Sequence, residues 1–113
     1  MKVEKQIDDA LKGRDDLIRI LDAAADFLAS RDTDADSEVT ATWHLRSGPN
    51  GEPGITLDLR DEEYTRAQWF PPNQLVPTDM RELRLVQLWN DVLQQRTHRQ
   101  MRKVNELISQ LED

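Results

Sequence analysis

Hydrophobic positions repeat at helical spacing along the first quarter of the chain. Val3, Ile7, Ala10, Leu17, Leu21, Ala24 and Leu28 form one stripe with steps mainly of three and four residues. This pattern predicts a helix over residues 3–29. Gly13 lies near its middle and weakens a helix by about 1 kcal/mol relative to alanine. We therefore expect the first dozen residues to fray or kink.

A polar run, SRDTDADSE, follows and predicts an acidic loop over residues 30–37. Asp32, Asp34 and Asp36 have the spacing that opens a calcium-binding loop. Such a loop also needs a glycine and a closing glutamate, and those positions hold Ser37 and Trp43. A solvated loop is the favoured interpretation, and calcium binding is the alternative.

After residue 37 the period changes to two, which indicates strands. Two runs alternate apolar with polar side chains, and their apolar members are Val39, Ala41, Trp43, Leu45, Ile55, Leu57 and Leu59. The intervening SGPNGEPG supplies a turn and matches no phosphate-binding glycine pattern. We expect a hairpin whose apolar face meets the helices, while Thr42, Thr56 and Asp58 face solvent.

Residues 61–70 have two interpretations. A third strand would complete a β-meander over residues 38–70, because Trp69 and Phe70 directly precede Pro71 and the residue before a proline favours extended geometry. The alternative is a short helix that begins near Asp61, since acidic residues favour a first helical turn. The third strand is favoured.

The stretch QWFPPNQL raises the question of whether Trp69 and Phe70 form a docking motif or pack at a corner. The double proline cannot donate ladder hydrogen bonds, and Pro77 precedes Thr78, a good helix N-cap. The proline spacing does not form a polyproline ligand. We expect a proline corner over residues 71–78 with both aromatic side chains packed under it, and partner contact is the alternative.

Residues 79–111 contain no proline or glycine and predict one long helix. Its stripe is Met80, Leu83, Val86, Trp89, Leu93, Val104, Leu107 and Leu111. Leu85, Leu88 and Val92 widen the apolar surface of the first half, which indicates burial on more than one side. The chain is thus expected to be one α+β domain over residues 1–113. Its elements are a long N-terminal helix, an antiparallel hairpin or three-stranded meander, and a long C-terminal helix.

The composition excludes several classes of function. The 113 residues include no cysteine, which excludes disulfides and thiol nucleophiles and fits a cytoplasmic protein. No run approaches the roughly 18 apolar residues of a membrane span. The net charge is −7, and the first 38 residues carry 11 acidic against 6 basic side chains. An acidic surface repels nucleic acid and anionic lipid, so we expect neither as a partner.

Candidate catalytic groups are few. His44 and His98 are the two histidines, and neither has a partner nearby in the sequence. Adjacent acidic residues such as Asp8 and Asp9 would point about 100° apart on a helix. We therefore expect both histidines at the surface, with no catalytic site, no metal and no cofactor.

A basic patch interrupts the last helix and contains Arg96, Arg99, Arg102 and Lys103. Three of its members share a helix face, which suits an anionic ligand or nucleic acid. No aromatic residue lies between them to stack on bases. The favoured interpretation is pairing with acidic residues of the first helix, with the two helices antiparallel; the expected partners include Asp15, Asp22 and Asp26.

The expected fold has two long amphipathic helices and no set of catalytic side chains. This combination favours a non-catalytic assembly or protein–protein interaction module. A helix over residues 79–111 is roughly 50 Å long, whereas a compact domain of this size is roughly 35 Å across. We therefore expect a homodimer joined through helices. The candidate interface residues are Leu85, Leu88, Trp89, Val92, Val104, Leu107, Ile108, Leu111, Trp69 and Phe70. Alternatives are a ligand-binding protein or enzyme with its site at a subunit interface, and nucleic-acid binding through the basic patch.

Overall fold

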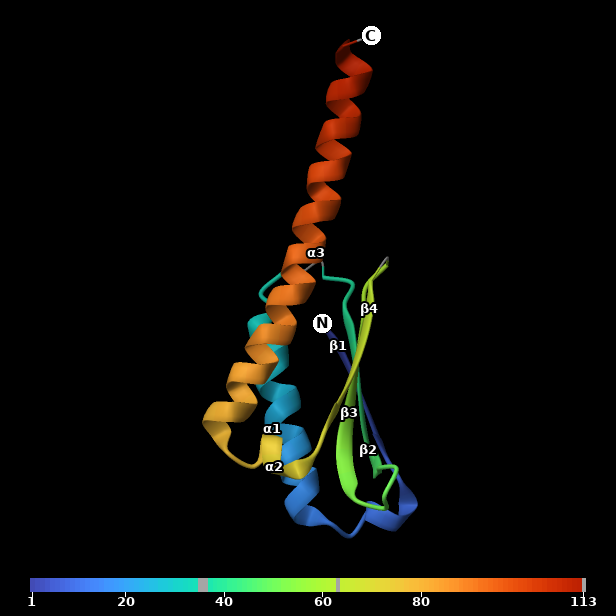
Figure 1. Ribbon diagram of the computed structural model, residues 1–113, viewed down its shortest axis with the longest axis vertical. Helices are drawn as coiled ribbons and strands as arrows, with labels where there is room; N and C mark the ends of the chain where they lie inside the picture. Colours follow the sequence, from blue (N-terminus) through green and yellow to red (C-terminus); the bar gives the residue numbers. More distant parts are fainter. Residues whose placement is uncertain (35–36, 63, 113) are drawn as a thin grey trace.

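A computed structural model gives the fold, and it describes residues 1–34, 37–62 and 64–112 (Figure 1). The elements in chain order are β1 (Lys2–Ile7), the 3-10 helix η1 (Asp9–Leu11), α1 (Asp15–Arg31), β2 (Thr40–Ser47), β3 (Pro53–Arg60), β4 (Thr65–Phe70), α2 (Pro72–Leu75) and α3 (Thr78–Glu112). The expected α+β class is confirmed, although the arrangement begins with a strand.

The four strands form one mixed sheet in the order β1-β2-β3-β4. β1 pairs parallel with β2, and α1 is the crossover between them, as parallel neighbours require. β3 and β4 continue the sheet with antiparallel pairing. Figure 1 shows α1 and α3 on the same face of this sheet. The hydrophobic core therefore lies between one face of the sheet and the helices.

The strand register confirms the expected hairpin. Trp43 lies opposite Leu57, and both side chains are buried in the core. Thr42 lies opposite Asp58 on the other face, where both are only half-buried. A slip of one residue would exchange the two faces, so this alternation fixes the register.

The expected helix over residues 3–29 is wrong in its first part, because Lys2–Ile7 forms β1 and the helix begins only at Asp15. Residues four apart share a face in a strand as well as in a helix, so Val3 and Ile7 satisfy both periods. The parallel pairing with β2 supplies the backbone hydrogen bonds, and Lys5 Nζ lies 3.0 Å from Asp22 Oδ1 on α1.

The third strand is confirmed as β4, and the proline corner contains the single-turn helix α2. Phe70 is fully buried in the core. Trp69 points to the opposite face of the sheet, where its ring lies over Gly48 and Gly54; a Cβ at Gly48 would come within 2.7 Å of Trp69 Cζ2. Trp69 therefore packs on the outer face of the sheet, and of the two aromatic residues only Phe70 packs into the core.

α3 extends well beyond the sheet. The molecule measures 63 × 25 × 24 Å, and the C-terminal part of α3 projects beyond the sheet along that long axis (Figure 1). α1 and α3 run in the same direction, from the end of the sheet near α2 toward the C-terminus (Figure 1). The antiparallel arrangement expected from the sequence is thus wrong.

Candidate interaction surface on the C-terminal helix

One face of α3 packs against its own domain. Leu85, Leu88, Trp89 and Val92 are all buried in the core. The sequence placed these four residues in a partner interface, but their own chain already covers them. The same face continues one and two turns later with Arg96 and Arg99, which are half-buried.

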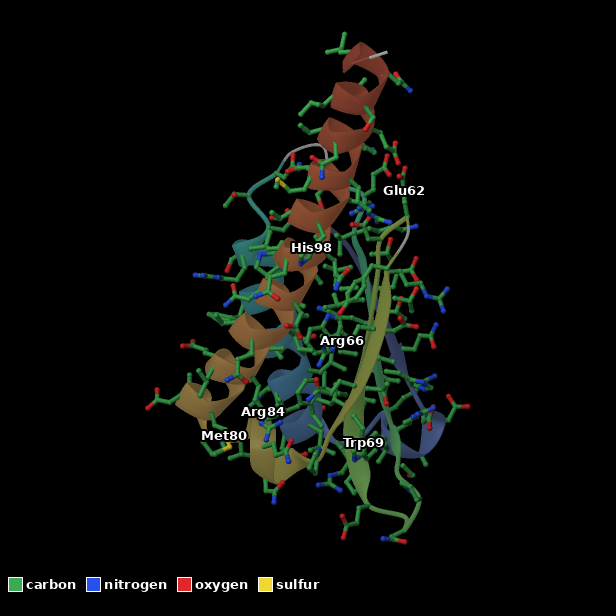
Figure 2. All side chains as sticks on the ribbon, turned by 45° about the horizontal axis from the view of Figure 1, so that its top comes forward. Glu62, Arg66, Trp69, Met80, Arg84 and His98 are labelled. Atoms are coloured by element: carbon green, nitrogen blue, oxygen red, sulfur yellow. The ribbon has the colours of Figure 1, made fainter. Side chains whose placement is uncertain are left out.

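The opposite face of α3 is exposed along its whole length. We call it the outer seam, and its residues follow one another at alternating steps of three and four: Met80, Leu83, Gln87, Asn90, Gln94, Thr97, Met101, Val104, Ile108 and Leu111. None of these side chains carries a charge. Steps of three and four are the spacing by which one helix packs along another. Met80 lies at the start of α3 (Figure 2) and is exposed.

The apolar members of the outer seam gather at its two ends. Met80 and Leu83 lie near the start of α3, and Val104, Ile108 and Leu111 lie near its end. Leu107 lies beside them and is 60% exposed, while Leu111 is 85% exposed. The expected interface residues of the C-terminal half are thus exposed, and Met80 and Leu83 join them on the same face.

In the projecting part of α3, the charged side chains lie away from the outer seam. Between residues 93 and 111 the charged residues are Arg96, Arg99, Arg102, Lys103 and Glu106. At 100° per residue, all of them lie on the face opposite the outer seam. Depletion of charge from an apolar surface is typical of the centre of a protein–protein interface.

Arg96 and Arg99 hold α3 to the sheet at the point where the helix leaves it. Arg99 Nη2 donates to Asp61 Oδ2 at 2.5 Å, and Arg96 Nε lies 3.7 Å from the same oxygen. Arg96 also donates to Ser37 Oγ at 2.8 Å and stacks over the Trp89 ring at 5.4 Å. The hydrogen bond from Arg99 lowers the pKa of Asp61 below its usual value, against the opposing effect of burial.

The sequence expectation for the partners of the basic patch was wrong. Asp61 comes from the turn between β3 and β4, whereas the expected partners Asp15, Asp22 and Asp26 all lie on α1. Because α1 and α3 run parallel, the end of α1 and the following loop lie near Arg96, which explains the contact with Ser37.

A shallow pocket of about 220 Å³ lies beside this contact. Its walls combine Arg96, Arg99 and Lys103 with the acidic residues Asp34, Glu38, Asp61 and Glu62. A hydrogen bond with Glu62 raises the pKa of Glu38, because a nearby carboxyl group disfavours its charged form. Acidic side chains thus accompany the basic ones, and this mixture disfavours an anion site.

His44 has a partner that the sequence could not indicate. Its Nε2 lies 2.7 Å from Asp8 Oδ1, across the β1–β2 pair. A hydrolytic site would also need a nucleophile in contact with the imidazole. In the ranges that the structure describes, no serine, threonine or tyrosine hydroxyl forms a hydrogen bond with His44. His98 is exposed on α3, at the position labelled in Figure 2.

No group of three or more His, Cys, Asp or Glu side chains in residues 1–34, 37–62 and 64–112 is placed to hold a metal ion. Asp36 of the calcium alternative lies outside the described residues. Within those residues, no helix combines the length and the hydrophobicity needed to cross a bilayer.

Sequence reasoning missed two parts of this surface. Met80 and Leu83 were assigned to the helix stripe but not to the interface, although their steps of three and four continue to Leu111. Asp61 was assigned to a turn, and nothing local in the sequence relates it to Arg99, 38 residues away. Comparison of the chain with protein-family models, with curated proteins and with solved structures found no match.

Proposed function

We propose that this protein is a non-catalytic assembly module that forms a homodimer through α3. The observation that carries the proposal is the projecting end of α3, where a charge-free apolar face has no cover from its own domain. Residues 101–111 are exposed on all sides. The cysteine-free composition supports the cytoplasm as the proposed location.

The exposed side chains are numerous enough to drive association. Full burial of one large apolar side chain contributes about 1.5–3 kcal/mol. A homodimer would bury Val104, Leu107, Ile108 and Leu111 twice, once from each copy. Estimates of the free-energy cost of association run from about 4 to 15 kcal/mol. The free energy gained by burying these side chains exceeds the lower of those estimates. Micromolar affinity is therefore a reasonable expectation.

The contacts of Arg96 and Arg99 favour assembly over nucleic-acid binding. Both side chains are engaged by Asp61, so they serve the fold. A phosphate backbone would have to displace an internal carboxylate, in a chain whose net charge is −7.

Light scattering on two matched variants tests this proposal. Leu107→Asp places a charge beside the exposed apolar face, whereas Gln110→Asp places the same charge three residues away on the polar side of the helix. Both residues are exposed, so neither substitution disturbs the core. We expect Leu107→Asp to give the 13.1 kDa mass of one chain and Gln110→Asp to keep the dimer mass. Equal masses for both variants would exclude α3 as the interface.

A further inference from the structure

We infer that the two copies pair antiparallel along the outer seam, so that the projecting half of each α3 lies on the domain-supported half of the other. This inference rests on the proposed homodimer and adds the orientation and register of the pair. Three features of α3 support it: the position of its apolar ends, the character of its two flanks and the direction of its helix dipole.

The two apolar ends of the outer seam match each other in an antiparallel pair. With Gln94 opposite Thr97 of the partner subunit at the two-fold axis, the heptad spacing sets the remaining layers. Leu83 then meets Ile108 of the partner subunit, and Met80 meets Leu111 of the partner subunit. The outermost apolar residues of each end thus meet those of the other end of the second copy. Further in, Val104 meets Gln87 of the partner subunit and Met101 meets Asn90 of the partner subunit, and Gln94 and Thr97 meet at the two-fold axis.

The flanks of the outer seam differ, and this difference selects the orientation. On one side lie Val86, Leu93, Gln100 and Leu107, and on the other lie Arg84, Asp91, His98 and Asn105. An antiparallel pair brings like flanks together, so the largely apolar flank meets its own copy and the polar flank does the same. A parallel pair would place each apolar flank against the polar one.

The helix dipoles favour the same orientation. A parallel pair would place the two like helix ends side by side, whereas an antiparallel pair aligns the two dipoles in opposite directions.

The domain does not obstruct this pairing. The buried face of α3, with Leu85 and Val92, meets its own sheet, and the outer seam lies on the opposite side of the helix. Two copies joined through the outer seam therefore keep their sheets on the outside of the pair.

Disulfide mapping tests the register directly, because the chain has no cysteine of its own. The double variant Leu83→Cys/Ile108→Cys is purified, oxidised and digested, and the linked peptides are identified by mass. The two positions lie about 37 Å apart along one helix, so a bridge cannot form within a chain. We expect most of the protein to form dimers in which position 83 is joined to position 108.

The single variants Leu83→Cys and Ile108→Cys are the controls, and we expect neither to form a linked dimer. Bridges of 83 to 83 or 108 to 108 would show a parallel pair and overturn the antiparallel register. Absence of bridges in a protein that retains the dimer mass would also overturn it, while leaving the homodimer intact. If the protein has the mass of one chain before oxidation, the homodimer is excluded, and this inference is excluded with it.

Discussion

Arg99 on α3 donates to Asp61 in the β3–β4 turn, with 2.5 Å between Nη2 and Oδ2. The two side chains are 15% and 8% exposed, so water screens the contact only weakly. It lies where α3 leaves the sheet, and the residues beyond it are exposed. The contact therefore sets the direction in which the projecting half of α3 presents its outer seam.

Asp61→Asn removes the charge and keeps the shape of this side chain. We expect the free energy of unfolding to fall by about 2 kcal/mol, because hydrogen bonds to charged groups contribute about 1.5–3 kcal/mol. Urea unfolding measures the loss. Glu106→Gln is the matched control on the exposed part of α3, and we expect a change below about 0.5 kcal/mol.

The stabilisation by Asp61 should depend on pH in one direction. Its pKa in the folded protein is lowered by Arg99, so the unfolded chain takes up the proton first as the pH falls. The stabilisation is complete above the unfolded value of about 3.9 and disappears as the pH falls through the lower folded value. The difference between wild type and Asp61→Asn should be constant from pH 7 to about 5 and shrink below about pH 4. A difference that grew with acid would contradict this assignment.

Leu→Ala substitutions on the two faces of α3 should change the free energy of unfolding by different amounts. Leu85 is buried and Leu83 is 58% exposed on the opposite face. In the Leu107→Asp background, where assembly does not contribute, we expect Leu85→Ala to cost about 3 kcal/mol and Leu83→Ala about 0.5 kcal/mol or less. Chemical denaturation of both variants gives these values. Equal losses would show that the orientation of α3 is wrong.

The packing of Trp69 on glycine predicts the effect of a substitution in β3. A Cβ at Gly54 would clash with the Trp69 ring, with Cη2 at 2.5 Å. We expect Gly54→Ala to destabilise the protein by about 1–3 kcal/mol, since the ring must move from the sheet. Gly13 has no atom within 4 Å of such a Cβ, so Gly13→Ala is the control and should be neutral or stabilising. A Gly54→Ala variant as stable as wild type would contradict the described packing.

Strong periodicity made parts of this fold predictable from the sequence. The alternation around Trp43 and Leu57 indicated the hairpin and its inner face, and the long run after Pro77 indicated α3. β1 could not be distinguished from a helix, because Val3 and Ile7 share a face in both structures. Its pairing with β2 joins residues 38 positions apart, and no local pattern encodes that contact.

The candidate surface was predictable only in part. Leu107, Ile108 and Leu111 could be assigned because they are apolar at the end of a helix longer than a compact domain. Leu85 and Val92 have the same spacing and character, and only the position of the sheet shows that they are buried. The direction of α3 relative to α1 follows from the parallel crossover, which the sequence did not reveal.

The mass of the unmodified chain in solution is the most direct test of assembly through α3. Sedimentation equilibrium between about 1 and 100 μM should show a species of twice the 13.1 kDa chain mass, with dissociation toward the dilute end if the affinity is micromolar. A mass of 13.1 kDa at every concentration would contradict the homodimer.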